Sequence, residues 1–115
     1  MIWMLCKGHT ILARRWKSRV GEIDLIVRRG MMLIFIEVKF RSSPHHALVR
    51  ITDHLVVPGL RQRQRIMRAA QAFAIQQRTS DEFDWRFDIV QMQWPSWKNW
   101  KFLHHTPNAW TADGL

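Results

Sequence analysis

Two neighbouring segments with the composition of paired β-strands constrain the fold of this chain more than any other feature. Residues 22–28 and 31–40 are rich in Ile, Val, Leu and Phe, and Arg29-Gly30 between them has the chemistry of a tight turn. The pattern predicts a β-hairpin. A two-residue turn at Arg29-Gly30 would place Glu22 directly opposite Glu37.

One face of the predicted hairpin is acidic at the end far from the turn. Successive side chains of a strand point to opposite faces, so Glu22 and Asp24 share a face, and the predicted turn brings Glu37 and Lys39 to that face. The opposite face is uniformly apolar and is expected to pack into the core. Its members are Ile23, Leu25, Val27, Ile34, Ile36 and Val38.

Carboxylates gathered in this way need a positive partner. Directly opposite side chains in an antiparallel pair have Cβ atoms about 4.5–5.5 Å apart, so ionised acids there repel each other. Such groups are tolerated when they bind a metal, pair with a cation or take up a proton. Lys39 supplies only one cation. A hard divalent ion such as Mg²⁺ or Mn²⁺ would supply the rest, because such ions favour oxygen ligands.

This arrangement predicts a chemistry. A metal held by Asp24 and Glu37 would polarise a phosphodiester and lower the pKa of bound water, while Lys39 would orient the attacking water or stabilise developing charge. The expected reaction is hydrolysis of a nucleic-acid backbone. Solvated salt bridges from the acids to nearby arginines are the structural alternative, which the spacing leaves open. The available arginines are Arg19, Arg28 and Arg41.

Charge and cysteine content indicate the partner and the compartment. The net charge of +9 and the pI of about 11.3 favour polyanionic partners such as nucleic acid. The lone Cys6 cannot form an internal disulfide, and no apolar run approaches the roughly 20 residues that span a bilayer. We therefore expect a cytoplasmic protein without a membrane partner. Its 115 residues fit one domain, residues 1–115.

The remaining elements complete a mixed fold. Residues 10–16, 85–93 and 98–104 are predicted strands, and residues 60–78 are a predicted helix because they lack Pro and Gly and repeat apolar residues at helical spacing. Residues 41–58 carry mixed signals, either loop or short helix. The order of elements predicts an α/β (α+β) domain with a mixed sheet.

The predicted helix carries a basic stripe and an inward-facing glutamine. Arg61, Arg65 and Arg68 fall on one side of the helical wheel and, with Arg41, are candidate nucleic-acid-binding residues. An ordinary solvated helix face is the alternative for the stripe. Gln62 lies on the buried side of the wheel.

Other polar and aromatic groups have simpler expected roles. Tryptophans and lysines alternate over residues 94–101 and could stack unpaired bases, although packing is the commoner role of Trp. The pairs His45-His46 and His104-His105 are not expected to bind a metal, because neighbours on a strand point apart. Arg86 and Asp88 share a strand face and are expected to form a structural pair.

Two motifs carry a family resemblance. Gly21-Glu22-Ile23-Asp24-Leu25-Ile26, followed by Phe35-Ile36-Glu37-Val38-Lys39-Phe40-Arg41, resembles the YraN-like family of small uncharacterised bacterial proteins. Residues 68–73, 86–90 and 105–110 extend the resemblance. That family is similar to restriction-endonuclease-like nucleases of the PD-(D/E)-x-K type, which implies a central mixed β-sheet flanked by helices and a Mg²⁺-dependent site. By this resemblance Asp24 and Glu37 would be metal ligands, Lys39 the catalytic lysine and Glu22 an accessory acid.

The chain departs from the family pattern in two places. Family members usually begin with a longer helix carrying a Glu that can complete the site, whereas only its end, near Leu5 to Gly8, is recognisable here. Either the start codon is misplaced or the site lacks one acidic group. Gln62 stands where the family tends to have Lys. It could reach the carboxylates as part of the site or be a buried structural residue.

Three functions follow as expectations. The first is a Mg²⁺- or Mn²⁺-dependent endonuclease that acts on DNA or branched DNA, with RNA also possible. The second is a catalytically silent nucleic-acid-binding module with a nuclease-like fold. The third is a protein-interaction module whose exposed sheet pairs with another chain, for example in a homodimer.

Overall fold

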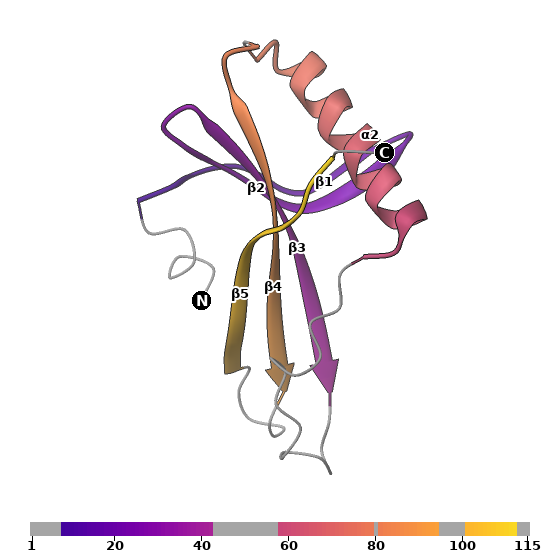
Figure 1. The fold of residues 1–115 in the computed structure, drawn as a ribbon, viewed down its shortest axis with the longest axis vertical. Coiled ribbons are helices and arrows are strands. Elements are labelled where there is room, and N and C mark those ends of the chain that lie inside the picture. Colours follow the sequence, from indigo (N-terminus) through magenta and orange to yellow (C-terminus); the bar gives the residue numbers. More distant parts are fainter. Residues whose placement is uncertain (1–7, 43–57, 80, 95–100, 113–115) are drawn as a thin grey trace.

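The protein folds as one mixed β-sheet with a helix on one face (Figure 1). The computed structural model describes residues 8–42, 58–79, 81–94 and 101–112, with only the backbone described at 40–42, 93–94 and 101–104. Its elements are β1 (Thr10–Ser18), β2 (Gly21–Arg29), β3 (Met32–Ser42), α2 (Leu60–Gln76), β4 (Asp84–Trp94) and β5 (Lys101–Trp110). The predicted order of elements and the α+β class are confirmed, and this architecture is compatible with a nuclease-like fold.

The sheet follows the chain order β1-β2-β3-β4-β5. β3 and β4 are parallel, and α2 makes the crossover between them, while the other neighbours are antiparallel. Among the described residues, α2 is not long and apolar enough to cross a lipid bilayer.

The β2–β3 turn lies one residue later than predicted. Arg29 pairs with Met32, so the turn residues are Gly30 and Met31. Gly30 has φ +59° at the first turn position, where hairpin turns require a positive φ that glycine adopts without steric cost. The predicted pairing of Glu22 with Glu37 is therefore wrong, and the register brings Asp24 next to Glu37. The shift of two positions keeps the paired residues of β2 and β3 on their predicted faces.

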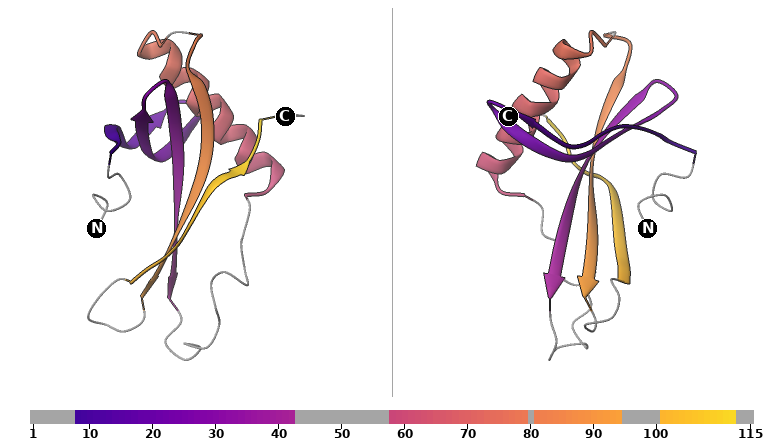
Figure 2. Two further views of the ribbon diagram at one scale, coloured as in Figure 1. Left: turned by 60° about the vertical axis from the view of Figure 1, so that its left-hand side comes forward. Right: turned by 180° about the vertical axis from the view of Figure 1, so that it is seen from behind.

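The two strands of this hairpin separate beside the acidic residues. The β2–β3 pairing ends at Leu25 and Ile36, whereas β2 stays paired with β1 as far as Gly21. β3 instead continues alongside β4 to Ser42. The β1–β2 end therefore turns towards α2 (Figures 1 and 2), and we call the point of separation the strand fork.

Core residues lie on both faces of the sheet. On the α2 side, Phe35 contacts Phe73 edge-on with ring centroids 6.3 Å apart, and Ile26 packs in the same cluster. On the other face, Leu25, Val27, Ile34, Ile36, Val90 and Met92 form a second cluster. Ile23 departs from the prediction because it packs in the α2-side cluster. Its part of β2 lies beyond the fork and turns towards the helix.

Gly21 allows β2 to approach α2 closely, so Gly21→Ala is expected to destabilise the fold by about 1–3 kcal/mol through overpacking. An added Cβ would lie 2.9 Å from the Arg65 carbonyl oxygen, which belongs to the helix backbone and cannot easily move. Urea unfolding measures the effect. At Gly59 an added Cβ meets no atom within 4 Å, so Gly59→Ala is the control and should cost less. Equal losses for both variants would contradict the close approach.

Candidate active site

The strand fork brings the predicted acidic residues together. Asp24 on β2 and Glu37 on β3 line one cavity of about 390 Å³, together with Glu22 and with Gln62 and Arg65 of α2. Asp24 Oδ2 accepts a hydrogen bond of 2.8 Å from the Val38 backbone N–H. That bond spans the fork and fixes the carboxylate of one strand beside the backbone of the other.

Glu37 has one well-partnered oxygen and one without a partner. Its Oε1 accepts a 2.5 Å hydrogen bond from Gln62 Nε2 and lies 3.2 Å from Lys39 Nζ. Its Oε2 is buried and has no hydrogen-bond partner in the described part of the chain. Burial raises the pKa of Glu37 above its ordinary value, Lys39 opposes the rise, and the charge of Asp24 adds to it. This carboxyl group is therefore short of positive charge.

A hard divalent cation fits this donor set. Glu37 Oε2 is an unsatisfied oxygen of the type that Mg²⁺ and Mn²⁺ bind, and Asp24 provides a second carboxylate in the same cavity. The described residues contain no cluster of three or more His, Cys, Asp or Glu arranged for a metal. A cation here would take two carboxylates from the described residues and several water molecules, as Mg²⁺ commonly does.

Glu22 of β2 and Gln62 of α2 both line the cavity. Glu22 is exposed on β2, where its Cα partner in β1 is Lys17. Gln62 is half-buried in the first turn of α2 and reaches Glu37 through its amide. Of the two roles that the sequence left open for Gln62, contact with the carboxylates is the one that the structure shows.

Only part of the predicted nucleic-acid-binding set can be placed. Arg61, Arg65 and Arg68 are all exposed on α2, and Arg65 lines the cavity. The side chain of Arg41 lies outside the described residues, as do the side chains of His45, His46 and His104 and those of the tryptophans at 94, 97 and 100.

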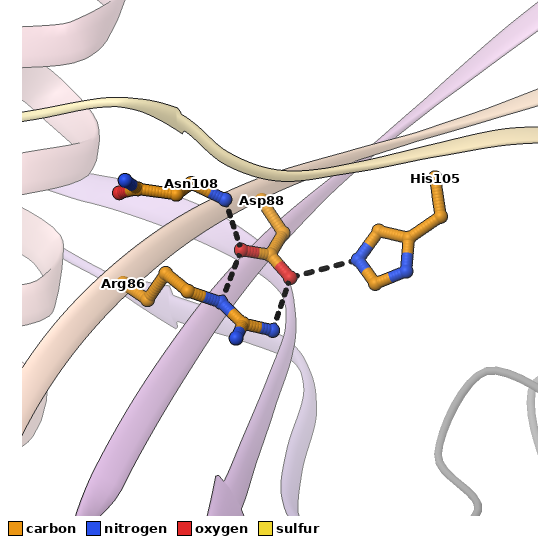
Figure 3. Close-up of polar contacts among 4 residues, drawn as sticks. All are labelled: Arg86, Asp88, His105 and Asn108. Atoms are coloured by element: carbon orange, nitrogen blue, oxygen red, sulfur yellow. Dashed lines mark hydrogen bonds and ion pairs between the residues drawn. The ribbon is translucent and has the colours of Figure 1, made fainter.

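The sequence reasoning missed a second polar centre, around Asp88 (Figure 3). Arg86 donates to both oxygens of Asp88, at 2.8 and 2.9 Å, which confirms the predicted pair. His105 Nε2 lies 2.7 Å from Oδ2, and the Asn108 backbone N–H donates to Oδ1 at 2.9 Å. Burial alone would raise the pKa of Asp88, but the hydrogen bonds from His105, Arg86 and Asn108 together lower it.

Asp88 lies at the wall of the candidate site, but its carboxylate is fully engaged by its own partners. Asp88 and Trp110 both line the cavity, and Trp110 stacks on Phe87 with ring centroids 4.0 Å apart. The Asp88 carboxylate is fully buried, and its partners saturate it. It therefore positions β5 against β4 and is not a free ligand.

The fold and site define a small α+β protein with two carboxylates and a lysine at a strand fork. Residues 1–92 match the model of the uncharacterised protein family UPF0102. A UPF0102 protein of Paramagnetospirillum magneticum is 36% identical over 97% of this chain and 81% of its own length. One of Nitrobacter winogradskyi is 40% identical over 76% of this chain and 69% of its own length. The chain belongs to the UPF0102 family, which confirms the YraN-like resemblance.

Proposed function

We propose that this protein is a Mg²⁺- or Mn²⁺-dependent endonuclease that hydrolyses phosphodiester bonds of nucleic acid, with DNA or branched DNA favoured and RNA possible. The observation that carries the proposal is that Oε2 of Glu37 is buried without a hydrogen-bond partner among the described residues, in the cavity that Asp24 also lines. An oxygen of this kind is costly unless a proton or a cation satisfies it. The single cysteine and the net charge of +9 support a cytoplasmic protein with a polyanionic substrate.

Each residue at the fork has a role that its contacts support. When bound, the metal would act as a Lewis acid on the phosphodiester and lower the pKa of a water molecule. Asp24 and Glu37 would hold it. Lys39, whose Nζ lies 3.2 Å from Glu37 Oε1, would orient the attacking water or stabilise charge on the phosphate. Gln62 holds Oε1, so that Oε2 remains as the ligand.

A catalytically silent nucleic-acid-binding module is the second candidate. Gln62 favours it, because a neutral amide contacts Glu37 at a position where the resemblance leads us to expect a lysine. The described site also offers only two carboxylates as ligands. This alternative retains salt-sensitive binding through Arg61, Arg65 and Arg68 but lacks cleavage.

Cleavage assays separate the two candidates. Duplex, single-stranded and branched DNA and RNA are incubated with the protein in Mg²⁺, Mn²⁺ or EDTA. Metal-dependent cleavage is expected, and Asp24→Ala or Lys39→Ala should reduce it by about 100-fold or more. Asp84→Ala, which removes an exposed aspartate at the start of β4, is the matched control and should cleave normally.

Two outcomes would decide against the proposal. Cleavage that survives both Asp24→Ala and Lys39→Ala would reject this site. Salt-sensitive binding without cleavage in any metal would establish the silent module instead.

A further inference from the structure

A second basic surface lies on β1, the edge strand of the described sheet next to β2. Its residues Arg14, Arg15 and Lys17 are all exposed. Within the described residues, none of the three makes an ion pair. Three exposed cations therefore lie on one short stretch of this strand, and none of them is held in an ion pair with another described residue.

The register places this surface beside the candidate active site. Lys17 is the direct partner of Glu22. Arg15 lies between the pairs Arg14–Leu25 and Trp16–Ile23, and is therefore opposite Asp24. Directly opposite residues of an antiparallel pair are nearest neighbours across the ladder. The basic residues of β1 thus follow the same stretch of β2 that supplies two of the cavity's acids.

The backbone of Arg15 is unusual for a residue within a strand. Its φ of +49° lies in the left-handed region, which residues with a Cβ rarely adopt. Ala13 and Trp16, on either side, both pack against the α2-side cluster, and Trp16 contacts Phe73 edge-on at 5.5 Å. Residues three apart on a regular strand point to opposite faces, and their partners Ile23 and Ile26 on β2 show the same departure. At this left-handed residue Arg14 and Arg15, although consecutive, are both exposed.

Protection of a sheet edge is the simpler explanation for charges on β1. Charged side chains on edge strands prevent pairing with other chains. That role does not require a position opposite Asp24 and Glu22, which line the cavity of the candidate active site.

We infer that Arg14, Arg15 and Lys17 of β1 form a second phosphate-binding row for the nucleic acid that reaches the strand fork, in addition to the arginines of α2. The placement of the ligand at the fork rests on the proposed function, whereas binding itself does not require cleavage. The partner is the phosphate backbone, because all three residues of the row are cations and none carries an aromatic ring on which a base could stack.

Binding measured without metal tests the inference. Fluorescence anisotropy with labelled duplex and single-stranded DNA, in EDTA and over a series of salt concentrations, gives the slope of log K against log salt. Arg15→Asn removes the charge but keeps a residue that tolerates a positive φ, and Lys17→Gln removes the second charge. For duplex DNA, each lost phosphate contact should reduce the slope by about 0.9, so the double variant should lose roughly 2. Arg29→Gln, an exposed arginine at the far end of β2, is the control and should bind as the wild type does.

The outcomes distinguish this inference from the proposed function. A double variant with the wild-type salt slope would overturn the inference, and self-association of that variant on size exclusion would establish edge protection instead. A wild-type protein that binds no nucleic acid would overturn it as well. A reduced slope in a protein that cleaves nothing would support the binding row while rejecting the endonuclease. If the wild type cleaves, the double variant should show a raised KM with little change in kcat.

Discussion

Glu37→Gln is expected to reduce metal-dependent cleavage by about 1,000-fold, equivalent to about 4 kcal/mol, while leaving the metal-free protein at least as stable as the wild type at neutral pH. The substitution removes the proposed ligand oxygen Oε2, which has no partner among the described residues, and the buried charge, but keeps the size of the side chain. Its amide oxygen can still accept the hydrogen bond from Gln62. Single-turnover cleavage and urea unfolding in EDTA measure the two effects.

The raised pKa of Glu37 predicts the direction in which the stability of the wild type changes with pH. The folded protein holds the Glu37 proton more tightly than the unfolded chain does, because burial raises the pKa. Glu37 therefore contributes stability at low pH that is lost as the pH rises through its raised folded-state pKa. In EDTA the stability of Glu37→Gln should not fall in this way as the pH rises. Added Mg²⁺ should restore the lost stability of the wild type but should not stabilise the variant. A variant that is less stable than the wild type at neutral pH without metal would contradict the inferred cost of burying the Glu37 charge.

Asp88→Ala is expected to lower the free energy of unfolding by about 3 kcal/mol. The substitution leaves the Arg86 guanidinium and His105 without their acceptor, and it removes the anchor of the Asn108 N–H, whose residue has a left-handed φ of +52°. For a domain of this size the melting temperature should fall by roughly 10–20 °C. Thermal unfolding followed by circular dichroism measures the shift.

Asp84→Ala, at an exposed position of the same strand, is the control for Asp88→Ala and should change stability by no more than about 0.5 kcal/mol. The lowered pKa of Asp88 gives the opposite pH dependence to that of Glu37. Its stabilisation is present above the unfolded-state pKa and is lost as the pH falls through the folded-state pKa. A loss below about 1 kcal/mol for Asp88→Ala would mean that the network does not hold β5 in place.

The local parts of the fold could be predicted from the sequence because they depend on local patterns. Apolar alternation identified β2 and β3, and helical spacing around Ile66 identified α2. The predicted turn position was wrong by one residue, but Asp24 and Glu37 were still correctly predicted to lie together. The resulting register shift of two positions does not change the face to which a strand residue points. The predicted pairing of β2 residues with β3 residues was wrong, since it depends on which turn position Gly30 occupies.

Contacts between residues far apart in the chain could not be predicted from local sequence patterns. Asp88 meets His105 and Asn108, which are 17 and 20 residues away, only because β5 pairs beside β4 with an irregular register. The helical wheel predicted that Gln62 faces inward. Its contact with Glu37 also depends on the distance between α2 and β3, which is a property of tertiary packing.

Titration of Mn²⁺ into isotope-labelled protein, followed by paramagnetic broadening of its NMR signals, tests the proposed metal site most directly. The predicted result is selective broadening at Asp24, Glu37 and Val38 at low Mn²⁺ concentration, and its loss in Glu37→Gln. Broadening that spares the strand fork, or that is unchanged in Glu37→Gln, would show that these carboxylates do not hold a divalent ion.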